Sequence, residues 1–325
     1  MNSTIYGLKR VLQETFNRYK LACISVLILI IVSAFANVYG SMFLKTLIDD
    51  YITPMLSQET PDFNPLIQAI MTLICIYIVG ILSTYAFNRI MVTVSLGTLK
   101  SIRDELFEHM ETLPIKFFDT HAHGDIMSIY TNDTDTLRQL LSQSLPQMIN
   151  SLITMISVLI SMLILNIPLA IVTLIMGGIM VITSRVITKK SSFYFRRQQK
   201  DLGIVNGFIE EMMEGCKVIK VFTHEQDSIK DFDKLNEQLF EASTNANMFA
   251  NILMPIVMNI GYASYVLTAV VGSILAINNM AGLTLGTIAA FLQLNRSFNA
   301  PIGQISQQLN AVVMAGAGAQ RIYSV

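Results

Sequence analysis

The feature that most constrains this chain is a series of long apolar segments, at residues 21–44, 66–88, 145–165, 169–187, 253–277 and 282–303. Each is close to the roughly 20 residues that a helix needs to cross the hydrocarbon core of a bilayer. The segments are continuous rather than alternating, which argues against the strands of a membrane barrel. Only 14% of the residues are charged, whereas a soluble domain has about 25%. We therefore expect an all-α membrane protein with six transmembrane helices.

Positive charge is concentrated on one side of these segments. Basic residues precede the first segment and follow the fourth, whereas the loop after the first is acidic. They are Lys9, Arg10, Arg18, Lys20, Arg185, Lys189, Lys190, Arg196, Arg197 and Lys200. The positive-inside rule predicts a multi-pass protein of the cell membrane with both termini in the cytoplasm. A net charge of −1 provides no basic excess for binding nucleic acid.

Two polar stretches, 90–144 and 188–252, interrupt the apolar segments. Both contain apolar residues at helical spacing, such as Leu99, Ile102 and Leu106 in the first stretch. We expect the membrane helices to continue past the bilayer by about 20 residues, or about 30 Å, and then to turn back. The prediction is two long cytoplasmic helical hairpins.

The first hairpin should turn between Pro114 and Asp125. Pro114 stops the descending helix because it lacks an N–H, Gly124 permits a sharp turn, and Asp125 can cap the returning helix. Two aromatic residues, Phe117 and Phe118, lie between them. This pair either forms a docking surface or simply closes the hairpin, and the sequence leaves both interpretations open.

The second hairpin should turn between Gly215 and Gln226. Gly215 ends one helix, and Thr223 with Gln226 matches a capping box that opens the next. The residues between them are expected to form a short crosswise helix. This helix would present Val218, Ile219 and Phe222.

Together, these features resemble the transmembrane domain of ATP-binding-cassette (ABC) exporters, over essentially the whole chain. The second hairpin and the sixth segment are most similar to those of heterodimeric bacterial multidrug exporters. The residues that carry the resemblance include Phe117, Phe118, Asp119, Gly124, Asp125, Ile126, Ser128, Thr131, Asn132, Asp133, Asp135, Glu210, Glu211, Gly215, Val218, Ile219, Lys220, Phe222, Glu225, Gly286, Phe298, Pro301, Arg321, Ile322 and Tyr323.

The resemblance implies a domain-swapped dimer of two six-helix halves, the second being a different subunit or an identical copy. Each half works with a nucleotide-binding domain, which binds ATP and Mg. The two hairpin tips act as coupling helices that sit in grooves on those domains. The implied coupling residues are Phe117, Phe118, Asp119, Gly124 and Asp125 in the first tip, and Gly215, Val218, Ile219, Lys220, Phe222 and Glu225 in the second.

Two departures from the family pattern stand out. The sequence contains no G-x-x-x-x-G-K-[ST] phosphate loop, so ATP and Mg are expected to bind to nucleotide-binding domains outside it. The chain would then be an excised transmembrane domain, or its ATPase a separate chain. Ile129 stands where the family usually has an arginine after Ser128.

Polar residues within the apolar segments are candidates for a substrate pathway, because they cost free energy in lipid. We select Gln293, Arg296, Ser297, Gln304, Asn259, Tyr262, Asn150 and Asn37. Arg296 either faces a cavity or pairs with a neighbouring helix. Isolated serines and threonines are better explained by interhelical hydrogen bonds. We expect no catalytic residue and no metal, since the only spaced pair, His121 and His123, lacks a third ligand.

The leading hypothesis is ATP-driven export of amphipathic or hydrophobic small molecules by alternating access, with membrane lipid around the spans. The chain would be no enzyme by itself but part of an ATP-hydrolysing translocase. One alternative keeps the fold and exports a lipid or a peptide. Another, from a different class, is a non-transporting membrane scaffold or receptor. Gene sequence beyond Val325 would discriminate, because a downstream phosphate loop favours the exporter.

Overall fold

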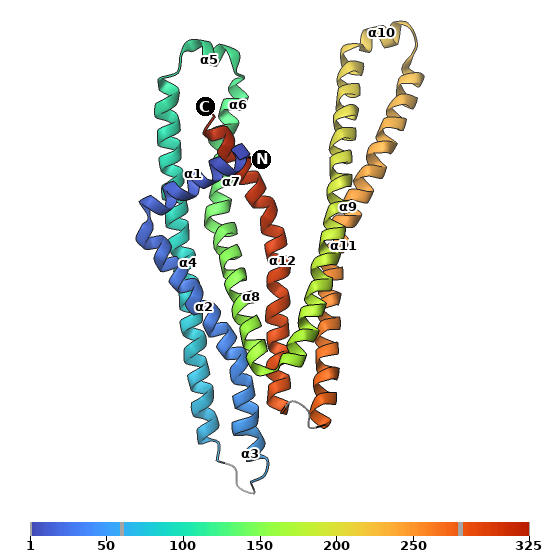
Figure 1. The fold of residues 1–325 in the computed structure, drawn as a ribbon. Coiled ribbons are helices and arrows are strands. Elements are labelled where there is room, and N and C mark those ends of the chain that lie inside the picture. Colours follow the sequence, from blue (N-terminus) through green and yellow to red (C-terminus); the bar gives the residue numbers. More distant parts are fainter. Residues whose placement is uncertain (1, 59–61, 279–281, 325) are drawn as a thin grey trace. The chain divides into compact units, whose positions relative to one another are not determined.

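The computed structural model describes residues 2–58, 62–278 and 282–324, and every element within these ranges is helical (Figure 1). In chain order they are α1 (Asn2–Arg18), α2 (Lys20–Thr46), η1 (Leu47–Ile52), α3 (Thr53–Met55), α4 (Asn64–Glu111), α5 (Ile115–Thr120), α6 (His123–Ser128), η2 (Ile129–Asp133), α7 (Thr134–Gln139), η3 (Leu140–Ser144), α8 (Leu145–Leu165), α9 (Ile167–Glu214), α10 (Cys216–Val221), α11 (Glu225–Ile277) and α12 (Leu285–Ile322). The chain divides into two compact units, Met1–Val172 with Leu267–Val325, and Thr173–Val266.

Five helical segments in the described ranges are long and apolar enough to cross a membrane: Lys20–Met55, Asn64–Thr112, His123–Leu165, Ile167–Glu214 and Glu225–Ile277. They contain the first five predicted spans. The predicted span 282–303 falls mostly in α12, which is not among the five. Its polar residues, including Gln293, Asn295 and Arg296, lower its hydropathy. The all-α membrane fold is confirmed, and the count of six spans stays a prediction.

The helices run far beyond the width of a bilayer. α4 and α9 have 48 residues each and α11 has 53. At 1.5 Å per residue, α4 is about 70 Å long, more than twice the roughly 30 Å of the hydrocarbon core. The membrane helices therefore continue into long hairpins, as predicted.

The returning arm of the first hairpin is not a regular α-helix throughout. Two π-helical segments, η2 and η3, interrupt it on either side of α7. A π-helical turn adds one residue to the repeat and shifts the faces of the helix. Asp133, the last residue of η2, is buried.

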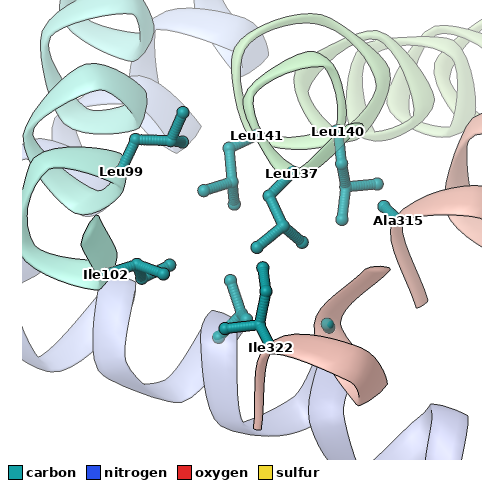
Figure 2. Close-up of a cluster of buried hydrophobic side chains, with 9 residues drawn as sticks. Leu99, Ile102, Leu137, Leu140, Leu141, Ala315 and Ile322 are labelled. Carbon is teal, nitrogen blue, oxygen red and sulfur yellow. The ribbon is translucent and has the colours of Figure 1, made fainter. Parts of the chain in front are cut away.

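A cluster of buried aliphatic side chains joins the first hairpin to the two ends of the chain (Figure 2). It contains Val11 from α1, Leu99 and Ile102 from α4, Leu137, Leu140 and Leu141 from the returning arm, and Ala315, Ala319 and Ile322 from α12. Ile129 packs against its edge. Burial of each large aliphatic side chain contributes about 1.5–3 kcal/mol, so this cluster fixes the last turns of α12 to the hairpin.

Polar contacts hold the two ends of the chain side by side, where the N and C labels adjoin in Figure 1. The hydroxyl of Tyr323 donates to Glu14 Oε2 at 2.7 Å, and Arg10 lies 4.2 Å above the Tyr323 ring. Burial and the neighbouring carboxylate raise the pKa of the Tyr323 phenol. The phenol is therefore a neutral donor at physiological pH.

A carboxylate fixes the opposite end of α12. Asp49, in η1, accepts the N–H of Gly286 at 3.0 Å and the hydroxyl of Thr284. Thr284 is itself the N-cap of α12 and accepts the N–H of Thr287. A Cβ at Gly286 would come within 2.7 Å of the Lys45 carbonyl oxygen, so only glycine permits this close approach.

Candidate functional site

The first tip consists of α5 and the start of α6. α4 ends at Glu111, and Pro114 has an extended conformation immediately before α5, as predicted for a residue that stops the descending helix. Phe117, Phe118 and Asp119 lie within α5. The short helix closes the hairpin, with the N–H of Phe117 bonded to the Pro114 carbonyl at 2.8 Å.

The two phenylalanines of this tip are half-buried rather than fully exposed. Their rings meet edge to face with 5.5 Å between centroids, and Phe117 also stacks on His121 at 4.1 Å. The most exposed apolar side chain of the tip is Ile115, at 80%. The aromatic pair therefore closes the hairpin, while Ile115, which the sequence analysis missed, offers the free apolar surface.

The prediction for the turn itself was wrong. The chain reverses at His121 and Ala122, which are both extended, and Gly124 lies inside α6 without a positive φ. Asp125 caps nothing, because Ala122 holds the N-cap position and no side chain bonds there. Two extended residues between short helices make the reversal without a special conformation. Asp125 still lies in the first turn of α6, where a negative charge is favourable.

The second tip forms the predicted short helix. α9 ends at Glu214, Gly215 follows it, and α10 spans Cys216–Val221. Val218 and Phe222 are 60% and 69% exposed, and Lys220 is exposed as well. Ile219 is half-buried, and Val221, which the sequence analysis omitted, is more exposed than either. The tip thus presents an apolar surface beside lysines.

The predicted capping box at the second tip was wrong by one residue. α11 begins at Glu225, so His224 rather than Thr223 precedes it. Thr223 instead ends α10 in the left-handed region with φ of 57°. The N–H of His224 bonds to the Ile219 carbonyl at 3.0 Å, in the pattern of a Schellman motif. A β-branched residue rarely adopts this conformation. The sequence pattern therefore favoured Thr223 as the N-cap of the next helix.

Beyond the tips, an ion pair connects the first hairpin to the last turn of α12. Arg321 donates to Oδ1 of Asp133, which is only 1% exposed. Burial raises the pKa of the Asp133 carboxyl, and the Arg321 charge acts in the opposite direction. α12 comes close here because residue 318 is glycine: a Cβ would lie 2.8 Å from Thr136 Oγ1.

Among the predicted pathway residues, Gln304 makes the clearest contacts. Its Oε1 accepts from Gln147 Nε2 at 2.8 Å and from Ser151 Oγ at 3.0 Å, which joins α12 to α8. Asn150, the predicted pathway residue on α8, is half-buried one residue away. Adjacent residues of a helix point about 100° apart, so Asn150 and Ser151 face different neighbours.

The other candidates are distributed over several elements. Gln293 and Arg296 are exposed and Ser297 is half-buried on α12. Asn37 lines an open groove of about 400 Å³ between α2 and α4, with Tyr77 and Tyr85. Asn259, whose Nδ2 donates to the Pro255 carbonyl, and the exposed Tyr262 belong to the other compact unit.

A buried polar chain at the centre of the first unit was missed. Asn295 is fully buried and donates to Thr268 Oγ1 at 3.0 Å, and Asn299 donates to Asn295 Oδ1 at 2.8 Å. The spacing of Asn295 and Asn299 places both on one face of α12, which was the available signal. The Asn295 amide thus connects α12 to α11, whereas Oδ1 of Asn299 has no hydrogen-bond partner within the described part of the chain.

Comparisons with known proteins agree with this architecture. The chain is 31% identical over 302 residues to the uncharacterized ABC transporter ATP-binding protein YfiC of Bacillus subtilis, covering 93% of this chain and 49% of that protein. A fatty acid ABC transporter ATP-binding/permease protein of Mycobacterium tuberculosis is 29% identical over 264 residues, 81% of this chain and 42% of that protein. A probable multidrug resistance ABC transporter ATP-binding/permease protein of Bacillus subtilis, YheH, is 24% identical over 273 residues, 81% and 40% respectively.

The chain spans about half the length of the curated relatives it matches. The family described as ABC transporter transmembrane region matches residues 23–302. The matched region includes both hairpins and nearly all of the predicted spans. The chain therefore belongs to the ABC transporter transmembrane region family, as its resemblance to ABC exporters predicted.

Proposed function

We propose that this chain forms the membrane pathway and the coupling helices of an ATP-driven exporter of amphipathic or hydrophobic compounds. In this proposal, nucleotide-binding domains bind ATP and Mg and close upon each other. The hairpins act as rigid levers that carry this motion to the spans, which alternate between two packed states. A second transmembrane half, identical or different, completes the pathway.

The observation that carries the proposal is the exposed apolar surface of the second tip. Val218 and Phe222 are 60% and 69% exposed on a short helix at the end of α9 and α11, which have 48 and 53 residues. Apolar side chains gathered at the end of such long arms are typical of a contact with another protein. A non-transporting scaffold would not need exposed apolar side chains at the tips of its hairpins to contact an ATPase domain.

The mostly uncharged polar side chains of α12 and α8 support this class of cargo. Gln293, Gln304 and Gln147 are neutral amides. Within the predicted span 282–303, the sequence has one charged residue, Arg296. A pathway of amides and aliphatic side chains favours molecules with large apolar surfaces and few charges.

A lipid-like cargo is the second candidate, and the comparisons give it specific support. One relative at 29% identity is named as a fatty acid transporter, and another at 24% as a probable multidrug resistance transporter. An amphipathic carboxylate fits the same pathway, with Arg296 as its counter-charge. We therefore keep fatty acids as the alternative cargo.

Transport into inverted vesicles tests both candidates. The vesicles would contain this chain produced with its nucleotide-binding domains, identified from the gene sequence that follows and from neighbouring genes. ATP-dependent uptake of a hydrophobic cationic dye supports the multidrug form, and uptake of a labelled long-chain fatty acid supports the alternative. Absence of any phosphate loop in the gene or its neighbours, with no uptake of either probe, would overturn the proposal.

A further inference from the structure

An apolar groove lies where α1 joins α2, outside the tips and the candidate pathway. It has a volume of about 340 Å³ and is lined from α1, α2, α4, η3 and α8 by residues that include Phe16, Cys23, Leu27, Met91 and Ile149. The lining side chains are aliphatic, aromatic or sulfur-containing apart from Thr15. The Thr15 hydroxyl donates to the Val11 carbonyl at 2.7 Å, so it is not available to orient a polar ligand.

The groove begins at the level where a membrane surface is expected. α1 ends at Arg18, Tyr19 breaks the helix with φ of −119° and ψ of 37°, and α2 starts at Lys20. The Tyr19 hydroxyl reaches α4 at Gly97, where a side chain would collide with it. Tyrosine, lysine and arginine are typical of the boundary between headgroups and hydrocarbon. From Cys23 to Ile30 the groove follows α2 inward for about 10 Å.

One basic residue lies beside the groove along the chain. Lys20 is exposed three residues before Cys23, which lines the groove, whereas Arg18 donates to Ser101 Oγ of α4 and lines a separate pocket with Glu14 and Glu105. No acidic residue occurs between Thr15 and Ile48. The nearest carboxylate of α1, Glu14, already accepts from Arg10 and from Tyr323. Lys20 therefore places positive charge beside an interior that accepts only hydrocarbon.

We propose that this groove holds one acyl chain of an anionic phospholipid as a resident lipid, with its headgroup at Lys20. The volume is at the small end for ligand pockets, and no polar groups converge to select a particular compound. An acyl chain needs no such groups, and basic residues at the surface select its headgroup. The bound chain fills the joint between α1 and the first span, and so supports the cluster that holds the end of α12.

Photocrosslinking in lipid nanodiscs tests the proposal directly. The whole chain is reconstituted in phosphatidylcholine with a small fraction of phosphatidylglycerol that carries a diazirine on one acyl chain, and crosslinked peptides are mapped by mass spectrometry. Crosslinks should concentrate on peptides that contain Phe16, Leu27 and Ile149. The same probe with a phosphatidylcholine headgroup should label them about fivefold less, as expected for a basic residue near an anionic lipid.

Variants separate the groove from the general lipid belt. Ile149→Trp fills the groove from α8 and should reduce these crosslinks several-fold, whereas Ile156→Trp, an exposed position on the same helix, should not. Lys20→Gln leaves the packing intact and should remove the headgroup preference alone. This last variant keeps the proposal testable if Ile149→Trp fails to fold.

Two results would overturn the proposal. The first is equal labelling of the groove and of exposed α4 positions such as Ile81, with no headgroup preference, which indicates an ordinary lipid belt. The second is displacement of the crosslink by a transported dye or fatty acid, which indicates a cargo site. Neither result bears on whether the tips couple ATP hydrolysis to transport, so the two proposals fail independently.

Discussion

Arg321, in the last turn of α12, donates to the buried carboxylate of Asp133 at the end of η2. The Arg321 side chain is 60% exposed, whereas Asp133 is almost completely covered. The second oxygen of Asp133 has no hydrogen-bond partner within the described part of the chain. The pair therefore fixes the last turn of α12 to the first hairpin, at the expense of desolvating a carboxylate.

The pH dependence of stability should reveal Asp133. Its pKa is raised by burial, so the folded state binds a proton more tightly than the unfolded state does. This contribution makes the protein more stable as the pH falls through the raised pKa, and less stable as the pH rises through it. Thermal unfolding of Asp133→Asn, measured from neutral to mildly acidic pH, should lack this part of the slope.

Asp135 provides the matched control for that experiment. Its pKa is lowered by the hydrogen bond from Arg138 at 2.7 Å. Its contribution is therefore present at neutral pH and is lost as the pH falls, so Asp135→Asn should change the slope in the opposite direction. The effect should be small because both groups are exposed. An Asp133→Asn protein with the pH slope of the wild type would contradict the assignment.

Gly318 should be sensitive to any added side chain. A Cβ there would lie 2.8 Å from Thr136 Oγ1 and 3.3 Å from the Asp133 carbonyl oxygen. Overpacking of this kind costs about 1–3 kcal/mol, so Gly318→Ala should lower the temperature of thermal unfolding. Gly303→Ala on the same helix meets nothing within 4 Å and should be neutral or slightly stabilising. Equal effects of the two substitutions would contradict this close approach.

Asp49 should control the first turn of α12. Asp49→Ala removes the acceptor of the Gly286 N–H and of the Thr284 hydroxyl, an interaction comparable to an N-cap of about 1–2 kcal/mol. Hydrogen exchange of the Gly286 amide should become faster. Asp50→Ala, at the exposed neighbouring position, is the control and should leave that amide unchanged. Unaltered exchange in Asp49→Ala would show that the carboxylate does not hold the helix end.

Replacing Thr223 with glycine should stabilise the second tip. Its φ of 57° is costly for a β-branched residue, by about 1–2 kcal/mol, and glycine adopts it without strain. Thr223→Gly should slow hydrogen exchange of the His224 amide, which bonds to Ile219. Thr120→Gly, in the helical conformation of α5, should instead loosen its tip. Faster exchange in Thr223→Gly would contradict the strain.

The sequence predicted the helices well because long apolar runs and apolar stripes are local signals. Pro114 and Gly215 marked helix ends correctly, since proline and glycine act through their own backbones. The turn at Gly124 was wrong because the chain needed no unusual φ there. Thr223 was misplaced because tertiary closure of the tip imposed a conformation that residue statistics disfavour.

The site was less predictable than the fold, because it depends on which helix faces meet. Asp133 contacts Arg321, which lies 188 residues later in the chain. Ser151, which was not among the predicted pathway residues, contacts Gln304 of another helix. No pattern within one helix indicates its rotation relative to another helix.

The most direct test of the account is the coupling efficiency of second-tip variants, measured with the nucleotide-binding domains present. The Val218→Ala, Phe222→Ala double variant should keep basal ATP hydrolysis but lose substrate-stimulated hydrolysis and uptake into inverted vesicles. Ile229→Ala, an exposed apolar position on the arm of the same hairpin, should behave as the wild type. Full transport per ATP hydrolysed in the double variant would contradict the proposal that this tip transmits the power stroke to the membrane.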